Sequence, residues 1–230
     1  MVVRCGNLPS GMKKDTIRDT LPRITLASAS PRRLEILGRL GIAVVVKSAD
    51  APEQTITTAT VSRTSDPHER CRRVTLERAR LKASAVAPDP STAAALAADT
   101  TVDAGGVLLD KPGDQEDARF MLRHLSGTTH LVHSAIILYD DPGAPDRWME
   151  EIVTSHVTFA PLTESDLEWY FAPRKHQEEE EWRGVAGGYR IQGLAGAFVQ
   201  DIRGSYEAVM GLPIHTVYSM IRRFFQPDKS

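Results

Sequence analysis

Short apolar runs alternate with longer amphipathic stretches along this chain, a pattern typical of an α/β protein. The short runs are rich in apolar and β-branched residues and predict strands over residues 23–27, 42–47, 93–98, 130–139, 148–160 and 197–202. Residues 102–109, with two central glycines, predict a hairpin. The amphipathic stretches predict helices over residues 31–40, 67–86, 115–125 and 164–171, and from residue 213 onward.

Helical spacing also predicts which side chains of the first two helices face the core. In the first helix we expect an inward stripe of Leu34, Leu37 and Leu40. In the second, the expected stripe is Cys71, Val74, Leu81 and Ala85. The other faces of this helix are basic, and we expect most of their cations to form a solvated surface; they are Arg70, Arg72, Arg73, Arg78, Arg80 and Lys82.

Composition and charge exclude some classes of protein for this chain. The chain has 230 residues, 41% of them hydrophobic, and a net charge of −2 from 28 Lys and Arg against 30 Asp and Glu. A balanced charge gives no field for polymeric nucleic acid, and no apolar run reaches a membrane span. Residues 1–22 predict a flexible leader without the features of a secretory or transit peptide. Two cysteines without metal or redox spacing indicate a cytoplasmic protein.

Two arginines stand in the first turn of the first predicted helix. Ser30 is a suitable cap and Pro31 suits the first helical position, so Arg32 and Arg33 follow directly. A helix N-terminus is already partly positive, so these cations repel it unless an anion binds there. Because guanidinium groups bind phosphate oxygens bidentately, the stretch predicts a phosphate site. The alternative is an ordinary helix start with solvated charges.

Two carboxylates are candidates for catalysis. Asp99 directly follows the predicted strand 93–98, and the end of a buried strand places a carboxylate rigidly beside a crevice. It could equally cap the next turn. Glu53 lies in a polar loop, where a solvated carboxylate is the simpler interpretation. The predicted hairpin returns Lys111 to the same edge of the sheet as Asp99.

A glycine-rich segment follows near the C-terminus. Residues 186–196 match neither the Rossmann nor the Walker spacing, but their glycines suggest close backbone approach around Gln192. The amide of Gln192 can donate and accept hydrogen bonds, so it could read the edge of a base. His130, His133 and His156 fall on predicted strands without ligand spacing, and we expect them to be structural.

Together, these motifs resemble the Maf family, named for septum formation in bacteria and similar to nucleoside triphosphate pyrophosphatases. They occur in the family's order from about residue 24 to about residue 222. The matching pieces are Leu26 to Arg33, Ala98-Asp99-Thr100, Lys111-Pro112, Leu125-Ser126-Gly127 with His130, Tyr189 to Gly193, and Gly204-Ser205-Tyr206 with Val209 to Pro213.

The resemblance implies a single Maf-like α/β domain over residues 23–226. Its fold would be Maf/ITPase-like: two lobes, an elongated mixed β-sheet flanked by helices, and a cleft between the lobes. The implied reaction is hydrolysis of a nucleoside triphosphate to the monophosphate and pyrophosphate with a divalent cation, Mg²⁺ or Mn²⁺. Such chemistry suits carboxylates and clustered cations.

The resemblance also implies roles for individual residues. Ser28, Arg32 and Arg33 would bind phosphates, with Lys82 and Lys111 as further catalytic cations. Asp99 would be the base or a metal ligand, and Glu53 a second metal ligand. Thr100 and Gln192 are similar to the pair in the subgroup that acts on dTTP and UTP.

At three places the chain departs from the family's pattern, and each departure bears on whether the site turns over its substrate. Asp110 replaces the usual glycine and puts negative charge beside Lys111, Val185 replaces a lysine, and the Glu-rich stretch 178–181 resembles an insertion. An alternative function is therefore a nucleotide-binding regulatory protein, linked to septum formation, that does not hydrolyse its ligand. A homodimer is the ordinary expectation for the assembly.

Overall fold

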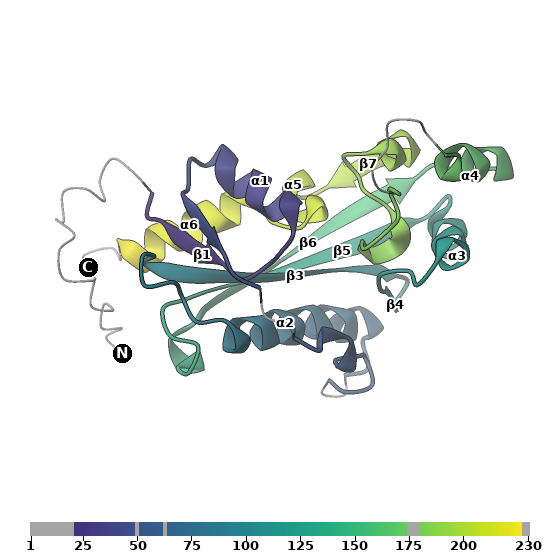
Figure 1. Cartoon of the computed structure of the whole chain (residues 1–230). Coiled ribbons are helices and arrows are strands. Elements are labelled where there is room, and N and C mark those ends of the chain that lie inside the picture. The colour runs from purple at the N-terminus through teal and green to yellow at the C-terminus, as the bar shows by residue number, and fades with distance from the viewer. Residues whose placement is uncertain (1–20, 49–50, 62–63, 174–179, 227–230) are drawn as a thin grey trace.

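An elongated seven-stranded sheet organises the molecule (Figure 1). The structure, a computed structural model, describes residues 21–48, 51–61, 64–173 and 180–226. The strands lie in the order β2-β1-β3-β5-β6-β7, and β4 pairs with β3 outside this path. β1 pairs in parallel with β2 and β3, whereas the other pairs are antiparallel. The mixed sheet of an α/β fold, as expected from the sequence, is confirmed.

The elements follow the chain in an order close to the prediction. The strands are β1 (Ile24–Leu26), β2 (Val44–Val46), β3 (Ala94–Ala104), β4 (Val107–Leu109), β5 (Thr129–Tyr139), β6 (Met149–Phe159) and β7 (Val199–Arg203). The α-helices are α1 (Pro31–Arg39), α2 (Pro67–Ala85), α3 (Gln115–Leu125), α4 (Glu164–Phe171), α5 (Tyr206–Met210) and α6 (Ile214–Phe225). The short 3-10 helices are η2 (Glu53–Thr55), η3 (Pro145–Arg147), η4 (Ala186–Gly188) and η5 (Leu194–Phe198).

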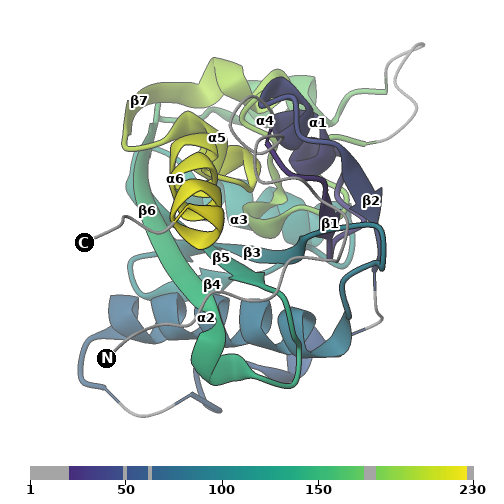
Figure 2. The ribbon, with the colours of Figure 1, turned by 90° about the vertical axis from the view of Figure 1, so that its left-hand side faces the viewer.

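Helices cover both faces of the sheet. α2 lies alone across one face, while α1, α5 and α6 lie on the other, as Figure 2 shows from the end of the sheet. The alternation along β3 explains this layering, because successive side chains point to opposite faces. Ala95 and Ala97 pack with Ala79 and Ala83 of α2, and these small side chains allow close helix–sheet contact. Leu96 belongs to the larger core on the other face.

Local sequence signals account for the helix starts. Asp66 caps α2 by accepting a hydrogen bond from the backbone N–H of His68, and Asp114 caps α3 in the same way. Thr163 and Asp166 form a capping box at the start of α4. Ser30 occupies the cap position of α1 in an extended conformation, but its side chain makes no capping hydrogen bond.

Several predicted burial patterns are wrong. Leu34 is exposed on α1, and Arg33 is buried in its helix instead, together with Ile36 and Leu37. Residues 42–47 do not form a fully buried strand, because β2 is the edge of the sheet and its side chains are only partly covered. The predicted strand 197–202 begins later, since residues up to Phe198 belong to η5.

The inward face of α2 also differs from the prediction. Leu81 is only half-buried and Ala85 is exposed, whereas Thr75 and Arg78 are buried. Arg78 is therefore an exception to the solvated basic surface that the sequence predicts. A polar stripe along the neighbouring strand β3 explains the difference, because Thr75 hydrogen-bonds to Thr101 of that strand. Arg78 has partners of its own, described below.

The remaining fold predictions concern the ends of the chain and its surroundings. The expected leader, residues 1–22, lies almost entirely outside the described residues, so it stays a prediction, as does the domain boundary at residue 226. Glu178 and Glu179 also lie outside them. Among the helices that the structure describes, none combines the length and apolar character that crossing a membrane requires.

Candidate active site

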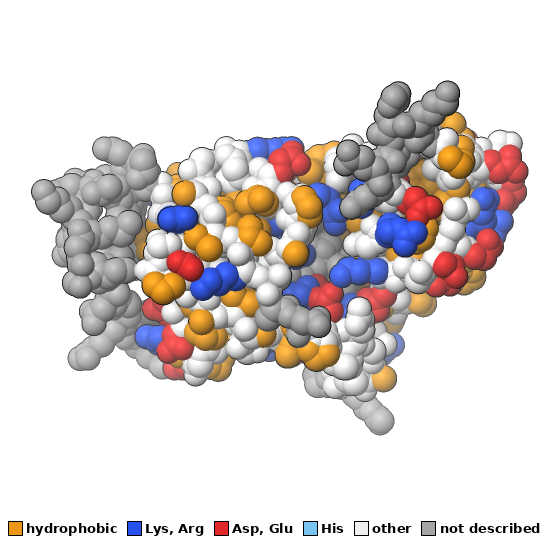
Figure 3. Space-filling view, in the orientation of Figure 1, with side chains coloured by type: hydrophobic (Ala, Val, Ile, Leu, Met, Phe, Trp, Pro, Cys, Tyr) orange, Lys and Arg blue, Asp and Glu red, His pale blue; other side chains and the backbone are white. Residues whose placement is uncertain are grey.

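One cavity of about 880 Å³ contains every residue that the sequence analysis selected for the site. These residues come from loops, helices and strands that lie far apart in the chain. They are Ser28, Arg32, Arg33, Glu53, Lys82, Asp99, Thr100, Lys111 and Gln192. Figure 3 shows Lys and Arg side chains beside Asp and Glu side chains around the hollow in the middle of one face. The structure thus brings the predicted residues together, whereas their individual roles remain predictions.

A gap in strand pairing makes room for the cavity. β1 pairs with Ala94–Leu96 at the start of β3, and β4 pairs with Val102–Ala104 at its end. Between them, Ala97 to Thr101 have no strand partner on that side among the described residues. The prediction that Asp99 ends its strand is wrong, because β3 continues to Ala104 and Asp99 pairs with Ala135 of β5. It is the end of β1 that opens a crevice beside Asp99.

We call Glu53, Lys82, Asp99 and Lys111 the carboxylate wall of the cavity. Lys82 projects from α2 and its ammonium group forms ion pairs with both carboxylates, at 2.6 Å from Asp99 Oδ1 and closely to Glu53 Oε2. Lys111 Nζ contacts Glu53 Oε1 at 3.0 Å. The two lysines and two carboxylates therefore form one connected, electrically balanced group.

The two carboxylates differ in their acidity. Burial raises the pKa of Asp99 above its ordinary value, and the nearby charges of Lys82 and Arg33 offset only part of this rise. Burial would also raise the pKa of Glu53, but Lys82 and Lys111 together lower it to about 2. Asp99 Oδ2 is buried and has no hydrogen-bond partner among the described residues. An unsatisfied carboxylate oxygen in a cavity is available to a proton donor or a cation.

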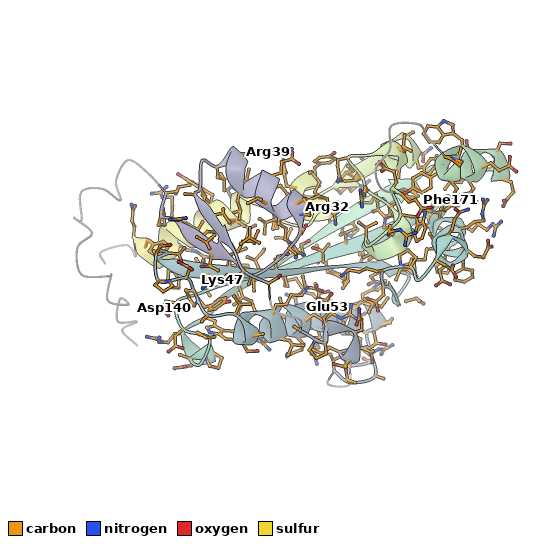
Figure 4. All side chains as sticks on the ribbon, in the orientation of Figure 1. Arg32, Arg39, Lys47, Glu53, Asp140 and Phe171 are labelled. Atoms are coloured by element: carbon orange, nitrogen blue, oxygen red, sulfur yellow. The ribbon has the colours of Figure 1, made fainter. Side chains whose placement is uncertain are left out.

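We call Ser28, Arg32, Arg33 and Thr100 the arginine wall. The guanidinium of Arg33 is buried and donates to Gly211 O at 2.9 Å, Ser28 Oγ at 3.0 Å and Thr100 Oγ1 at 3.3 Å. Arg32 Nε donates to Met210 O at 3.3 Å. Figure 4 labels Arg32 at the start of α1 and Glu53 on the other side of β3 in that view.

The carbonyl groups that hold these arginines come from the end of α5, a helix that the sequence analysis missed. Gly211 follows α5 with φ at 122°, a conformation that favours glycine. This turn directs the carbonyl oxygens of Met210 and Gly211 toward the start of α1. The pattern Val209 to Pro213 within the recognised motif was the available signal, but a helix of five residues is too short for a periodicity.

The glycine-rich segment forms a third side of the cavity. Gln192 lines it and is exposed, while Val185 lines it from a buried position. Arg183 and Arg190 also line the cavity, and the sequence analysis did not select either of them. Arg190 Nη2 donates to the backbone oxygen of Arg183 at 3.1 Å. The Tyr189 hydroxyl, next to Arg190, hydrogen-bonds to His130 Nε2 at 2.8 Å and anchors the segment to β5.

The predicted structural role of the histidines fits their positions. His130 and His133 are buried, and His133 contacts Asp103 and Thr154 rather than the cavity. His156 is exposed on β6. None of the three is among the described residues that line the cavity.

The cavity as a whole is strongly cationic. Six of its lining residues are Lys or Arg, and two are Asp or Glu, so the formal sum is +4. The cations are Arg32, Arg33, Lys82, Lys111, Arg183 and Arg190, and the anions are Glu53 and Asp99. Charge of this sign and density, with a buried carboxylate inside it, suits a ligand with several phosphates.

The residues present also fit a hard divalent cation that is shared with such a ligand. The described residues contain no group of three or more His, Cys, Asp or Glu that could hold a metal by themselves. However, Mg²⁺ is commonly bound by one or two carboxylates together with substrate phosphates. Glu53 and Asp99 supply two carboxylates, and Asp99 Oδ2 has no other partner.

Comparison with known proteins agrees with this geometry. The profile of a family described as "Maf-like protein" matches residues 23–224. A protein of Anaeromyxobacter dehalogenans (strain 2CP-C) named dTTP/UTP pyrophosphatase is 41% identical over 202 residues, which cover 88% of this chain and 94% of that protein. The protein of the same name from Escherichia coli (strain K12) is 39% identical, over 86% of this chain and 91% of its own length.

Proposed function

This chain belongs to the Maf-like family, and from that premise we propose that it hydrolyses dTTP, UTP or related nucleoside triphosphates, including modified ones, to the monophosphate and pyrophosphate. The observation that carries the proposal is the buried carboxylate of Asp99, with one unbonded oxygen, inside a cavity of formal charge +4. A protein that only binds phosphates needs the cations, whereas a buried carboxylate with a raised pKa adds a proton acceptor beside them. Hydrolysis requires a proton acceptor at that place.

The reaction can be written in terms of the residues of this chain. A water oxygen attacks the α-phosphorus, the bond from the α-phosphorus to the bridging oxygen breaks, and pyrophosphate leaves with that oxygen. Asp99 Oδ2 accepts the proton that the water gives up. The raised pKa of Asp99 makes it a better proton acceptor than an ordinary aspartate, because a base works best when its pKa approaches the working pH.

The cations of both walls stabilise the charge that moves during this step. Arg33 is fixed by three acceptors before any substrate binds, so it loses little conformational freedom on binding phosphate. Glu53 would hold Mg²⁺ or Mn²⁺ together with the phosphates, because the one oxygen of Asp99 that Lys82 does not hold serves as the proton acceptor in this scheme. When bound, the metal ion neutralises phosphate charge and makes the α-phosphorus a better electrophile.

Base recognition is assigned to Gln192, which is exposed, lines the cavity and can donate and accept hydrogen bonds with a pyrimidine edge. Thr100, the other member of the pair, lines the cavity and hydrogen-bonds to Arg33 of the arginine wall. The cytoplasmic location and the homodimer remain predictions of the sequence analysis.

Product analysis tests the proposal directly. The chain is incubated with dTTP, UTP and the other canonical and modified triphosphates, with Mg²⁺ or Mn²⁺ or neither, and pyrophosphate and orthophosphate are assayed separately. We expect monophosphate and pyrophosphate, highest with dTTP or UTP, dependent on the metal and lost in Asp99→Asn. Tight nucleotide binding without turnover would contradict the proposal and favour the regulatory alternative. Release of orthophosphate would show that a different bond is cleaved.

A further inference from the structure

Arg78 and Asp110 form an ion pair just behind the carboxylate wall. The side chain of Arg78 is only 5% exposed, and its two terminal nitrogens contact both carboxylate oxygens of Asp110, one of them at 3.1 Å. Its remaining donor, Nε, bonds to Ile56 O at 3.0 Å. One guanidinium of α2 thus joins two loops that are more than fifty residues apart in sequence. Neither Arg78 nor Asp110 is among the described residues that line the cavity.

Each of the joined loops carries a residue of the carboxylate wall. Ile56 closes the short helix η2, because its N–H donates to Glu53 O at 3.1 Å. Asp110 is covalently next to Lys111. The two wall residues meet in turn, with Lys111 Nζ at 3.0 Å from Glu53 Oε1. The contact between Glu53 and Lys111 therefore depends on how Arg78 holds the two loops.

The pair also extends to the glycine-rich segment. The backbone oxygen of Asp110 accepts a hydrogen bond from Gly187 N at 3.1 Å. Gly187 has φ at 71° and no room for a side chain, because a Cβ atom there would lie 3.0 Å from Val102. Fixing Asp110 thus also fixes the segment that leads to Gln192.

The charge of Asp110 has a different effect from the one that the sequence suggests. A carboxylate next to Lys111 in sequence is expected to weaken phosphate binding by that lysine. In the structure, the carboxylate is turned onto Arg78 and away from the cavity. A bidentate pair of this kind is geometrically specific as well as favourable. The negative charge of Asp110 is thereby balanced by Arg78, a cation that does not line the cavity.

We propose that the Arg78–Asp110 pair is a positioning element that sets the placement of Glu53 and Lys111 for the reaction. This inference rests on the proposed function. Arg78 and Asp110 are positioning residues, since they act through Glu53 and Lys111 and do not line the cavity. Misplacement of reacting groups by a distant substitution is sufficient for large losses of rate.

The chain contains a matched control on the same helix. Arg80 of α2 makes a bidentate pair with Glu150 of β6, at 2.9 Å and 2.6 Å, but this pair joins no loop of the site. Asp110→Asn and Glu150→Gln each remove one carboxylate charge from an arginine of α2 while keeping the size of the side chain. Asp110→Glu and Arg78→Lys test whether charge alone is enough, and they serve also if Asp110→Asn folds poorly.

Steady-state kinetics with dTTP, metal titration, thermal unfolding and hydrogen exchange distinguish positioning from general stability. For Asp110→Asn we expect kcat/KM to fall about 10- to 100-fold, with a higher metal concentration for half-maximal rate. We also expect faster exchange in peptides covering residues 51–57 and 107–114. Glu150→Gln should lower the thermal midpoint less, because Arg80 is more exposed than Arg78 and keeps its second partner Glu77, and it should leave kinetics and the exchange of those peptides unchanged. Asp110→Glu should recover part of the activity, and Arg78→Lys should recover less because lysine lacks the fork.

The outcomes separate this inference from the proposed function. If the unaltered chain hydrolyses dTTP and Asp110→Asn matches it in kinetics and metal requirement, the inference alone is overturned. If the unaltered chain does not hydrolyse any triphosphate, the proposed function fails, and hydrogen exchange then decides the inference. Unchanged exchange at residues 51–57 in Asp110→Asn would overturn it, whereas local loosening there would support a positioning role in whatever the site binds.

Discussion

On the arginine wall the guanidinium of Arg33 is held by three uncharged acceptors, whereas on the carboxylate wall the ammonium of Lys82 lies between two carboxylates. The formal charges differ accordingly. Arg32 and Arg33 contribute +2, while the two lysines and two carboxylates of the carboxylate wall cancel. Both walls are built from strongly polar side chains, but only the first presents net charge before a ligand arrives.

The difference suggests a division of work within one cavity. A cation held by carbonyl and hydroxyl oxygens keeps its full charge for the phosphates and is already in position. A cation held by carboxylates is neutralised, but its partners can rearrange around a metal ion or accept a proton. We therefore expect substitutions on the arginine wall to weaken substrate binding mainly, and those on the carboxylate wall to affect turnover most.

Asp99→Asn, on the carboxylate wall, should have the largest effect on activity. We expect kcat to fall by about 10²- to 10⁴-fold, because the amide cannot accept the proton from water. Because the pKa of Asp99 is raised, the folded chain holds the proton of this carboxyl more tightly than the unfolded chain does. The free energy of unfolding therefore falls as the pH rises from the ordinary aspartate pKa through the raised one. The variant should therefore unfold at a higher temperature than the unaltered chain, by a margin that is larger at neutral pH than at acidic pH.

Thermal melts at both pH values, beside single-turnover kinetics, measure the two effects. A loss of activity together with a lower thermal midpoint at both values would contradict the assignment. It would mean that Asp99 stabilises the fold through Lys82 instead of being kept there for chemistry.

Arg33→Lys tests the arginine wall. Lysine keeps the charge but cannot reach Gly211, Ser28 and Thr100 at once, so the cation is no longer fixed. Loss of hydrogen bonds to a charged group is worth about 1.5–3 kcal/mol, which corresponds to about a 10- to 100-fold rise in KM for dTTP. Arg39→Lys is the matched control, because Arg39 is on the same helix and contacts only the exposed Glu35 among the partners described. If KM is unchanged in Arg33→Lys while kcat falls, the two walls do not differ as described.

Lys111→Ala should have a smaller effect, since this lysine is exposed and Glu53 already neutralises it. An exposed ion pair is worth roughly 1 kcal/mol at most, so we expect KM to rise about fivefold. Removing Lys111 should also raise the pKa of Glu53 from its value of about 2, because one of the two cations that lower it is lost. The titration of the Glu53 carboxyl, followed by NMR, should then move to higher pH. A rise in KM above a hundredfold would show that Lys111 is not neutralised before substrate binds.

The comparison of the two walls also shows what the sequence can and cannot predict. Local motifs predicted Arg32 and Arg33 of the arginine wall, because Ser30, Pro31 and the two arginines define a helix start by themselves, whereas Ser28 and Thr100 were selected from the family resemblance. The selection of Glu53 and Lys82 depended on the family resemblance, since a loop carboxylate and a basic helix carry no local signal. Their ion pair joins residues about thirty positions apart, and only the fold brings them together.

The errors have a common physical cause. Arg33, Arg78 and Asp99 are charged residues that are buried in the structure. A prediction from hydrophobic periodicity instead expects charged side chains on the exposed face of an element. Arg78 is buried because Asp110 and Ile56 O satisfy all three of its donor groups, a condition set by two distant loops. Asp99 lies inside a strand because Thr100, Thr101 and Val102 continue it, and the crevice comes from the end of a neighbouring strand instead.

The smallest expected effect compares two adjacent threonines of β3. Thr100 Oγ1 accepts from Arg33 at 3.3 Å and lies 3.0 Å from Ser134 Oγ, while Thr101 Oγ1 contacts Thr75 on the opposite face of the sheet. Replacing either by valine keeps the shape and removes hydrogen bonds, so each variant should lose about 1 kcal/mol of stability. Only Thr100→Val should raise KM for dTTP, by about threefold, because only it loosens a cation of the arginine wall. Equal KM values in the two variants would mean that Gly211 O and Ser28 Oγ suffice to hold Arg33, and that the arginine wall is fixed from α5 and the start of α1 without help from the sheet.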